Sequence, residues 1–171
     1  MKNKITTMIF LTTLLIALIA PTTAKAATDA TSYSIPGKKG KITSNVWRSN
    51  YPSTSGNTGK YSYQVSAVYS GSKKVTEIKT TFRTGASLRN SASLNIGTSS
   101  GGASAGASSS WQTVSKTAYW INKNGSKTSS WRSNATFAPY RDYRKNTVFV
   151  MNTARVKLSG DQKPYEITAS I

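Results

Sequence analysis

The stretch of sequence that decides the fold is residues 61–69, Tyr-Ser-Tyr-Gln-Val-Ser-Ala-Val-Tyr. Every second position in it is aromatic or aliphatic, and the positions between are mostly small and polar. The alternating apolar positions are Tyr61, Tyr63, Val65, Ala67 and Tyr69. Because successive side chains of a strand point to opposite faces, this spacing is typical of a β-strand that buries one face. The stretch therefore predicts a half-buried strand.

Similar alternation continues on both sides of this strand. A Ser-Gly-Ser-Lys loop at residues 70–73 precedes a run with Ile78 and Phe82 on one face, which predicts a β-hairpin over residues 61–83. Asn124-Gly125 favours a tight turn and predicts a second hairpin between residues 111–121 and 127–137. Further strands are expected at residues 41–48, 86–96, 148–158 and 165–171.

The composition agrees with a protein made of strands. Good helix formers are scarce beyond residue 26, where serine and threonine are abundant. Short strands joined by turns predict an all-β, single-domain antiparallel β-sandwich or small barrel of about eight strands. Residues 50–59 read as a loop, and residues 97–110, composed of Gly, Ser, Ala and Thr, are expected to form a flexible loop.

The N-terminus has the three parts of a secretory signal peptide. Lys2 and Lys4 precede an apolar run at residues 5–20, and the small-x-small sequence of residues 24–26 follows. The run is shorter than the ~20 residues that a spanning helix needs. We expect cleavage after Ala26, a flexible basic segment at residues 27–40, and an all-β domain at residues 41–171. We expect a bacterial product that is secreted and extracellular, either free or associated with the cell wall.

The charge balance points to an acidic partner. The chain has 23 Lys and Arg residues against 5 Asp and Glu residues, a net charge of +18. A strong positive field concentrates polyanions around a protein. Outside a cell we expect the partner to be an anionic wall polymer, an acidic polysaccharide or an anionic membrane surface, with non-specific nucleic-acid binding at low salt. The alternative is that the charge serves solubility alone.

The residues that are missing exclude most catalytic chemistry. The chain has no histidine and no cysteine, which removes the usual general base, the thiol nucleophile and the best zinc ligands. Its five carboxylates are Asp29, Glu77, Asp142, Asp161 and Glu166, most of them far apart in sequence, as expected for isolated structural roles. We therefore expect a non-enzymatic protein that needs neither a cofactor nor a metal.

Aromatic residues beside cations mark the candidate ligand-binding residues. The first candidate is the cluster after Pro139, where amphipathic rings alternate with positive charges: Tyr140, Arg141, Tyr143, Arg144 and Lys145. The sequence Trp-Arg-Ser-Asn also occurs twice, at residues 47–50 and 131–134. On a strand, a buried Trp would leave the next residue exposed, so Arg48 and Arg132 are further surface candidates.

These observations favour a secreted cationic binding protein for anionic cell-envelope material. One alternative is a membrane-active, bacteriocin-like protein, because residues 86–96 and 111–121 match the ~9–11 residues of a tilted transmembrane strand. Another is a secreted inhibitor of another protein that presents the loop at residues 50–59. The sequence leaves the oligomeric state open.

Overall fold

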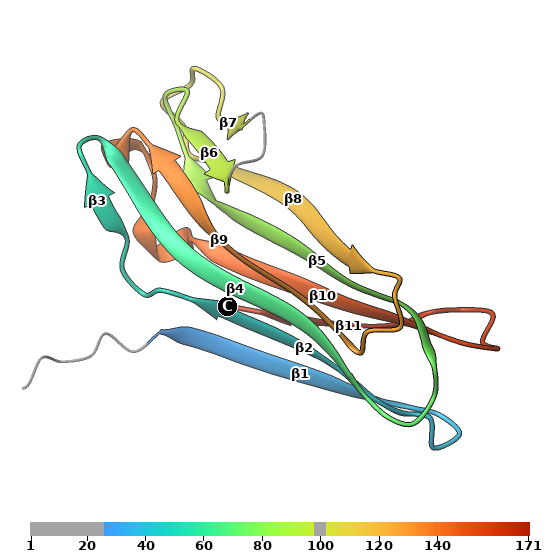
Figure 1. Cartoon of the computed structure of the whole chain (residues 1–171). Coiled ribbons are helices and arrows are strands. Elements are labelled where there is room, and N and C mark those ends of the chain that lie inside the picture. Colours follow the sequence, from blue (N-terminus) through green and yellow to red (C-terminus); the bar gives the residue numbers. More distant parts are fainter. Residues whose placement is uncertain (1–25, 98–101) are drawn as a thin grey trace, which may run out of the picture.

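Eleven strands form two antiparallel sheets in residues 26–97 and 102–171, the part of the chain that the computed structural model describes. The two sheets pack face to face as a β-sandwich (Figure 1), which confirms the predicted fold class. The number of strands exceeds the expected eight because three short strands flank the long ones. The expected signal peptide lies outside the described residues, except for Ala26.

The larger sheet, here called sheet A, has the order β1-β2-β4-β9-β6-β7, with β3 paired to β4. Its strands are β1 (Ala27–Ile35), β2 (Gly40–Arg48), β3 (Ser53–Ser55), β4 (Thr58–Ser70), β6 (Ser93–Ile96), β7 (Ala103–Ser104) and β9 (Thr128–Ala138).

The smaller sheet, here called sheet B, has the order β11-β10-β5-β8. Its strands are β5 (Val75–Leu88), β8 (Gln112–Asn122), β10 (Phe149–Leu158) and β11 (Tyr165–Ser170). Two 3-10 turns, η1 (Tyr140–Asp142) and η2 (Lys145–Thr147), connect β9 to β10.

Residues 61–69 form a strand that buries one face, as their alternation predicts. All five of its apolar side chains are buried in β4, and they face sheet B. The apolar core has two parts, one around Tyr63, Phe82 and Phe137, the other around Ile42, Ile78 and Val156. Burial of these large side chains stabilises the sandwich by roughly 1.5–3 kcal/mol each.

A buried polar layer lies among the strands that join the two halves of the core. Asn152 of β10 donates from Nδ2 to Ser44 Oγ over 3.0 Å and to the Ser66 carbonyl over 2.9 Å, and Thr80 donates to Asn152 Oδ1. Asn152, Ser44 and Thr80 are completely buried. These bonds connect β2 and β4 of sheet A with β5 and β10 of sheet B, so they fix how the sheets stack.

Two of the predicted hairpins are wrong. β4 belongs to sheet A and β5 to sheet B, so the turn at residues 71–74 crosses between the sheets. The Asn-Gly turn after β8 likewise leads from sheet B to β9 in sheet A. In both cases the flanking alternation is correct, but a short polar turn does not specify whether the next strand pairs or packs across the core.

The expected strand at residues 86–96 is also wrong. It is divided into the end of β5 in sheet B and β6 in sheet A. A turn separates them, in which Asn90 and Ser91 have positive φ angles of 50° and 59°. The membrane-insertion alternative depends on this run as one continuous strand, and the structure does not contain it.

The two segments expected to be flexible differ from that expectation. Residues 27–35 form β1, which pairs with β2 along its full length at the edge of sheet A. Its side chains alternate between half-buried and exposed over residues 27–32, as expected for an edge strand. Residues 102–110 are tied to the turn after β5 by backbone hydrogen bonds, among them Ala105 N to Ala92 O and Asn90 N to Ser108 O, both 2.9 Å. Residues 98–101 lie outside the described part of the chain.

Candidate anion-binding surfaces

The predicted cluster at residues 140–145 forms one end of the sandwich, where η1 and η2 lie beside the end of β5 (Figure 1). The backbone of this segment is held by Arg89 N to Asp142 O at 3.2 Å and Arg144 N to Ser87 O at 3.0 Å. Arg141, Arg144 and Lys145 are exposed and Tyr140 is half-buried. These four side chains are therefore available to a ligand, as the sequence predicts.

Tyr143 is the exception in this cluster, and its prediction as a ligand contact is wrong. It is 5% exposed, and its ring stacks on Phe137 with the centroids 5.0 Å apart. Gly59 of β4 leaves room for this ring, since a Cβ there would overlap the Tyr143 hydroxyl. Burial raises the pKa of the Tyr143 phenol, so the group stays neutral. Tyr143 anchors the segment to the core.

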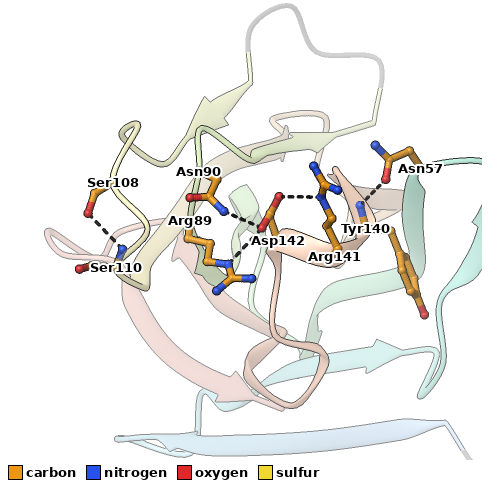
Figure 2. Close-up of polar contacts among 8 residues, drawn as sticks. All are labelled: Asn57, Arg89, Asn90, Ser108, Ser110, Tyr140, Arg141 and Asp142. Carbon is orange, nitrogen blue, oxygen red and sulfur yellow. Dashed lines mark hydrogen bonds and ion pairs between the residues drawn. The ribbon is translucent and has the colours of Figure 1, made fainter.

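Asp142 organises the cations around it. Its carboxylate accepts hydrogen bonds from Arg89 Nε at 3.0 Å and Asn90 Nδ2 at 2.9 Å, and Arg141 Nε lies 3.6 Å from its second oxygen. Figure 2 shows the carboxylate between these three side chains, with Tyr140 held at its backbone nitrogen by Asn57. The Asp142 side chain is only 4% exposed. A single buried carboxylate thus positions several positive charges at this end.

Two arginines converge on one indole ring in the same region. The guanidinium carbons of Arg89 and Arg144 lie 4.5 and 4.4 Å from the centroid of the Trp111 ring. Cation–π contacts fix the planes of the guanidinium groups and leave their edge N–H donors free to meet an anion. We call Arg89 and Arg144 on Trp111, together with Arg141 beside Asp142 and Lys145 over Tyr140, the arginine cluster. Neither Arg89 nor Trp111 was predicted, because each is far from residues 140–145 in sequence.

Arg48 does not have the predicted surface role. It follows Ile42, Ser44 and Val46 on the inward-facing side of β2, and its guanidinium carbon lies 5.3 Å from the centroid of the Tyr61 ring. Burial lowers the pKa of Arg48. Trp47 consequently faces outward, the reverse of the prediction, because the register of β2 is set by the three buried side chains before it.

Arg132 faces outward from β9, as predicted, but it lies away from the arginine cluster. Its Nη2 and Nε donate to Gln64 Oε1 of β4 over 2.7 and 3.2 Å. The second Trp of the repeated tetrapeptide, Trp131, is half-buried against Phe82. The two Trp-Arg pairs therefore have opposite orientations and do not form two equivalent corners.

The opposite end of the sandwich carries the densest positive charge. The turns β1–β2, β4–β5, β8–β9 and β10–β11 all meet there (Figure 1). Hydrogen bonds join them: Lys127 Nζ to Gly71 O at 2.7 Å and Ser159 N to Lys74 O at 2.9 Å. Eight lysines lie on or next to these turns. They are Lys38, Lys39, Lys41, Lys73, Lys74, Lys123, Lys127 and Lys163. We call them the lysine end.

The lysine end has little negative charge to balance it. Asp161 is the one acidic residue on the four turns, and it forms an ion pair with Lys39 and accepts a hydrogen bond from Tyr165 at 2.9 Å. The bond to Asp161 raises the pKa of Lys39, and the same bond lowers the pKa of Asp161. The other seven lysines are exposed. This surface could not be predicted from the sequence, because the fold topology, rather than sequence proximity, brings the lysines together.

No helix in residues 26–97 and 102–171 is long and apolar enough to cross a membrane. Within the same residues, no three carboxylates gather in a way that would hold a metal ion.

Comparison with known proteins adds no relative to this picture. No model of a known protein family matches the chain, and no curated protein matches its sequence. The fold itself, an all-β sandwich without cysteine, is what the structure establishes.

Proposed function

We propose that this chain is a secreted, non-enzymatic protein that binds anionic cell-envelope material through the lysine end. The observation that supports the proposal most strongly is the gathering of seven lysines on four adjoining turns, with Lys41 next to them and Asp161 as the one acidic residue on those turns. If the charge served solubility alone, we would expect the lysines to be spread over all faces. Their accumulation at one end instead creates a local positive field.

The chemistry of the lysine end suits a polymer or a surface better than a small molecule. Lysine ammonium groups are compact point charges on flexible stems, so they can follow phosphates or carboxylates of irregular spacing. Several weak contacts to one polymer chain add up, because the second and later contacts are intramolecular. Counterions released from the polyanion drive such binding, which is therefore sensitive to salt.

The arginine cluster supplies a second, more directional set of donors. β5 has 14 residues and separates the two ends by roughly 45 Å at ~3.3 Å per residue. Guanidinium groups can bind a carboxylate or phosphate through two parallel hydrogen bonds. The two ends are too far apart to contact one anionic group, but one extended polymer can reach both.

The proposal is tested with the mature chain and three probes: lipoteichoic acid, vesicles with 30% anionic lipid, and vesicles of neutral lipid. We expect binding to the first two, a loss of affinity of at least about tenfold between 50 and 200 mM NaCl, and no binding to the third. Affinity that does not change with salt would contradict the proposal.

Dye enclosed in the same vesicles separates binding from membrane damage. We expect the mature chain to bind anionic vesicles without releasing the dye, because residues 86–96 are divided between β5 and β6 and do not form one continuous strand. Dye release at micromolar protein would contradict the proposal in favour of a membrane-active protein.

Mass spectrometry of the exported product is expected to show an N-terminus at Ala27, and a retained N-terminal segment would contradict secretion by cleavage.

A further inference from the structure

The outer face of sheet A has a second set of polar groups, remote from both charged ends. Thr28, Trp47, Gln64 and Arg132 are direct partners across β1, β2, β4 and β9 and form one row. Gln64 lies between the buried Tyr63 and Val65, so its side chain points away from the core, and the three residues in register with it share that face. Most outward positions of these strands are serine, threonine, asparagine or glutamine, and Trp47 is the one aromatic residue among them.

Trp47 stands between two shallow depressions of this face. Each has a volume of about 420 Å³. The first is lined by both polar and apolar residues of β1, β2 and β4: Thr28, Asp29, Ala30, Asn45, Val46, Gln64, Val65 and Ser66. The second is lined by Ser62, Arg132, Ser133 and Asn134 on β4 and β9. Because Trp47 lines both, a chain-like ligand that fills the two depressions would contact its side chain in each.

The polar side chains of the face are held in place by one another. Ser62 Oγ donates to Asn134 Oδ1 at 3.0 Å, and Asn45 Nδ2 donates to Ser66 Oγ at 3.1 Å. Gln64 uses its Oε1 to accept from Arg132. These bonds fix the direction of the remaining donors, which include Gln64 Nε2, Asn134 Nδ2 and Arg132 Nη1. A ligand therefore meets donors that are already oriented.

The charge of the face is complementary to an acidic ligand. Its outward positions on β1, β2, β4 and β9 hold no carboxylate, and their cations are Lys60 and Arg132, apart from Lys41 at the lysine end. Asp29 of β1 points to the other side, where its Oδ2 accepts from Ser170 N at 3.1 Å. Arg132 beside the second depression can pair with a carboxylate through its unused edge.

We propose that this face binds an acidic polysaccharide, with one pyranose ring stacked on Trp47 and the carboxylate of a neighbouring hexuronate on Arg132. A pyranose ring has an apolar C–H face that packs on an indole and a rim of hydroxyl groups that need donors and acceptors. The oriented amides and hydroxyls on both sides of Trp47 supply them. The site, which we call the Trp47 face, is separate from the lysine end and does not depend on it.

The test is calorimetric titration of the mature chain at 150 mM NaCl with hexamers of galacturonate, mannuronate and hyaluronan, and with the fully methyl-esterified galacturonate hexamer as the uncharged control. We expect at least one acidic hexamer to bind. Trp47→Ala should lower the affinity for that hexamer by about tenfold or more, and Trp47→Tyr should restore most of the affinity by keeping a ring.

Arg132→Gln should lower the affinity for the acidic hexamer by about tenfold and leave the weak binding of the esterified hexamer unchanged. Lys73→Gln removes the same charge at the lysine end and should change hexamer affinity by less than about twofold. No binding of any acidic hexamer, or equal affinity of wild type and Trp47→Ala, would overturn the proposal.

Lipoteichoic acid binding by the same variants separates the two proposals. Trp47→Ala is expected to keep the salt-dependent binding that we assign to the lysine end, provided that its circular dichroism spectrum matches the wild type. If Trp47→Ala loses both ligands while remaining folded, the Trp47 face is not a separate site and this inference fails. If lipoteichoic acid binding is absent but hexamer binding depends on Trp47, only the proposed function of the lysine end fails.

Discussion

Arg89 donates a hydrogen bond from Nε to Oδ1 of Asp142 over 3.0 Å, and this bond joins the end of β5 to the 3-10 turn η1. Arg89 thereby faces Trp111 beside Arg144. The pair links folding and the proposed anion binding, because the same buried carboxylate that closes the end of the sandwich also positions the arginine cluster.

Replacing Asp142 is expected to change how stability depends on pH. Burial alone would raise the pKa of Asp142, but hydrogen bonds from Asn90 and Arg89 and the nearby charges hold it below its ordinary value. A lowered pKa in the folded state stabilises the protein above the pKa of the unfolded chain, about 4, and this stabilisation is lost as pH falls through the folded value.

Asp142→Asn should therefore be less stable than wild type at pH 7, with the difference in the free energy of unfolding shrinking below about pH 4. Urea unfolding between pH 2 and 7 measures it, and a difference that is constant over this range would contradict the assignment.

Removing the buried amide of Asn152 should destabilise the whole sandwich. Asn152→Ala leaves Ser44, Thr80 and the Ser66 carbonyl without their shared partner between the sheets. A buried polar group without a partner costs about 1–3 kcal/mol, so we expect a loss of at least about 2 kcal/mol in the free energy of unfolding. The exposed Asn146 provides the control, and Asn146→Ala should stay within about 0.5 kcal/mol of wild type. Equal stability of the two variants would contradict the role of the polar layer.

Lys116 is expected to keep the molecule from associating through β8. This strand is an edge of sheet B, and Lys116 pairs in register with the buried Thr84, so it points towards sheet A. An inward-pointing charge on an edge strand opposes pairing with another chain. Lys116→Val should therefore increase concentration-dependent association in analytical ultracentrifugation. Thr117→Val, on the outward side of the same strand, should not, and an equal effect of both changes would rule out the inward position as the cause.

The strands were predictable from sequence because alternation is a local property. Residues 61–69, 148–158 and 165–171 lie largely in β4, β10 and β11, and the five alternating apolar side chains of the first are buried as expected. Which of the two sheets each strand joins, in contrast, depends on contacts between residues far apart in sequence. The turns at residues 71–74 and 123–127 are short, polar and typical of hairpins, yet both cross the core, since the strands beyond them bury their apolar faces against the other sheet.

The candidate residues show the same division. Arg141, Arg144 and Lys145 are exposed as predicted, because charged side chains on a surface segment stay in water, although Asp142 and Tyr143 of the same segment are buried. Arg48 and Tyr143 were mispredicted, since β2 has plausible side chains on both faces and Tyr143 is the ring that fills the space beside Gly59. The lysine end could not be predicted, because its lysines come from four turns that only the folded topology unites.

The salt dependence of lipoteichoic acid binding by two variants of equal net charge tests the central proposal most directly. One variant changes a lysine of each turn at the lysine end to glutamine: Lys38, Lys73, Lys123 and Lys163. The control changes four cations elsewhere to glutamine: Lys60, Lys79, Arg83 and Arg132. The slope of log K against log salt should become flatter by about 3 in the first variant and by less than about 1 in the control. Equal slopes in the two variants would show that net charge alone drives binding and would contradict a dedicated lysine end.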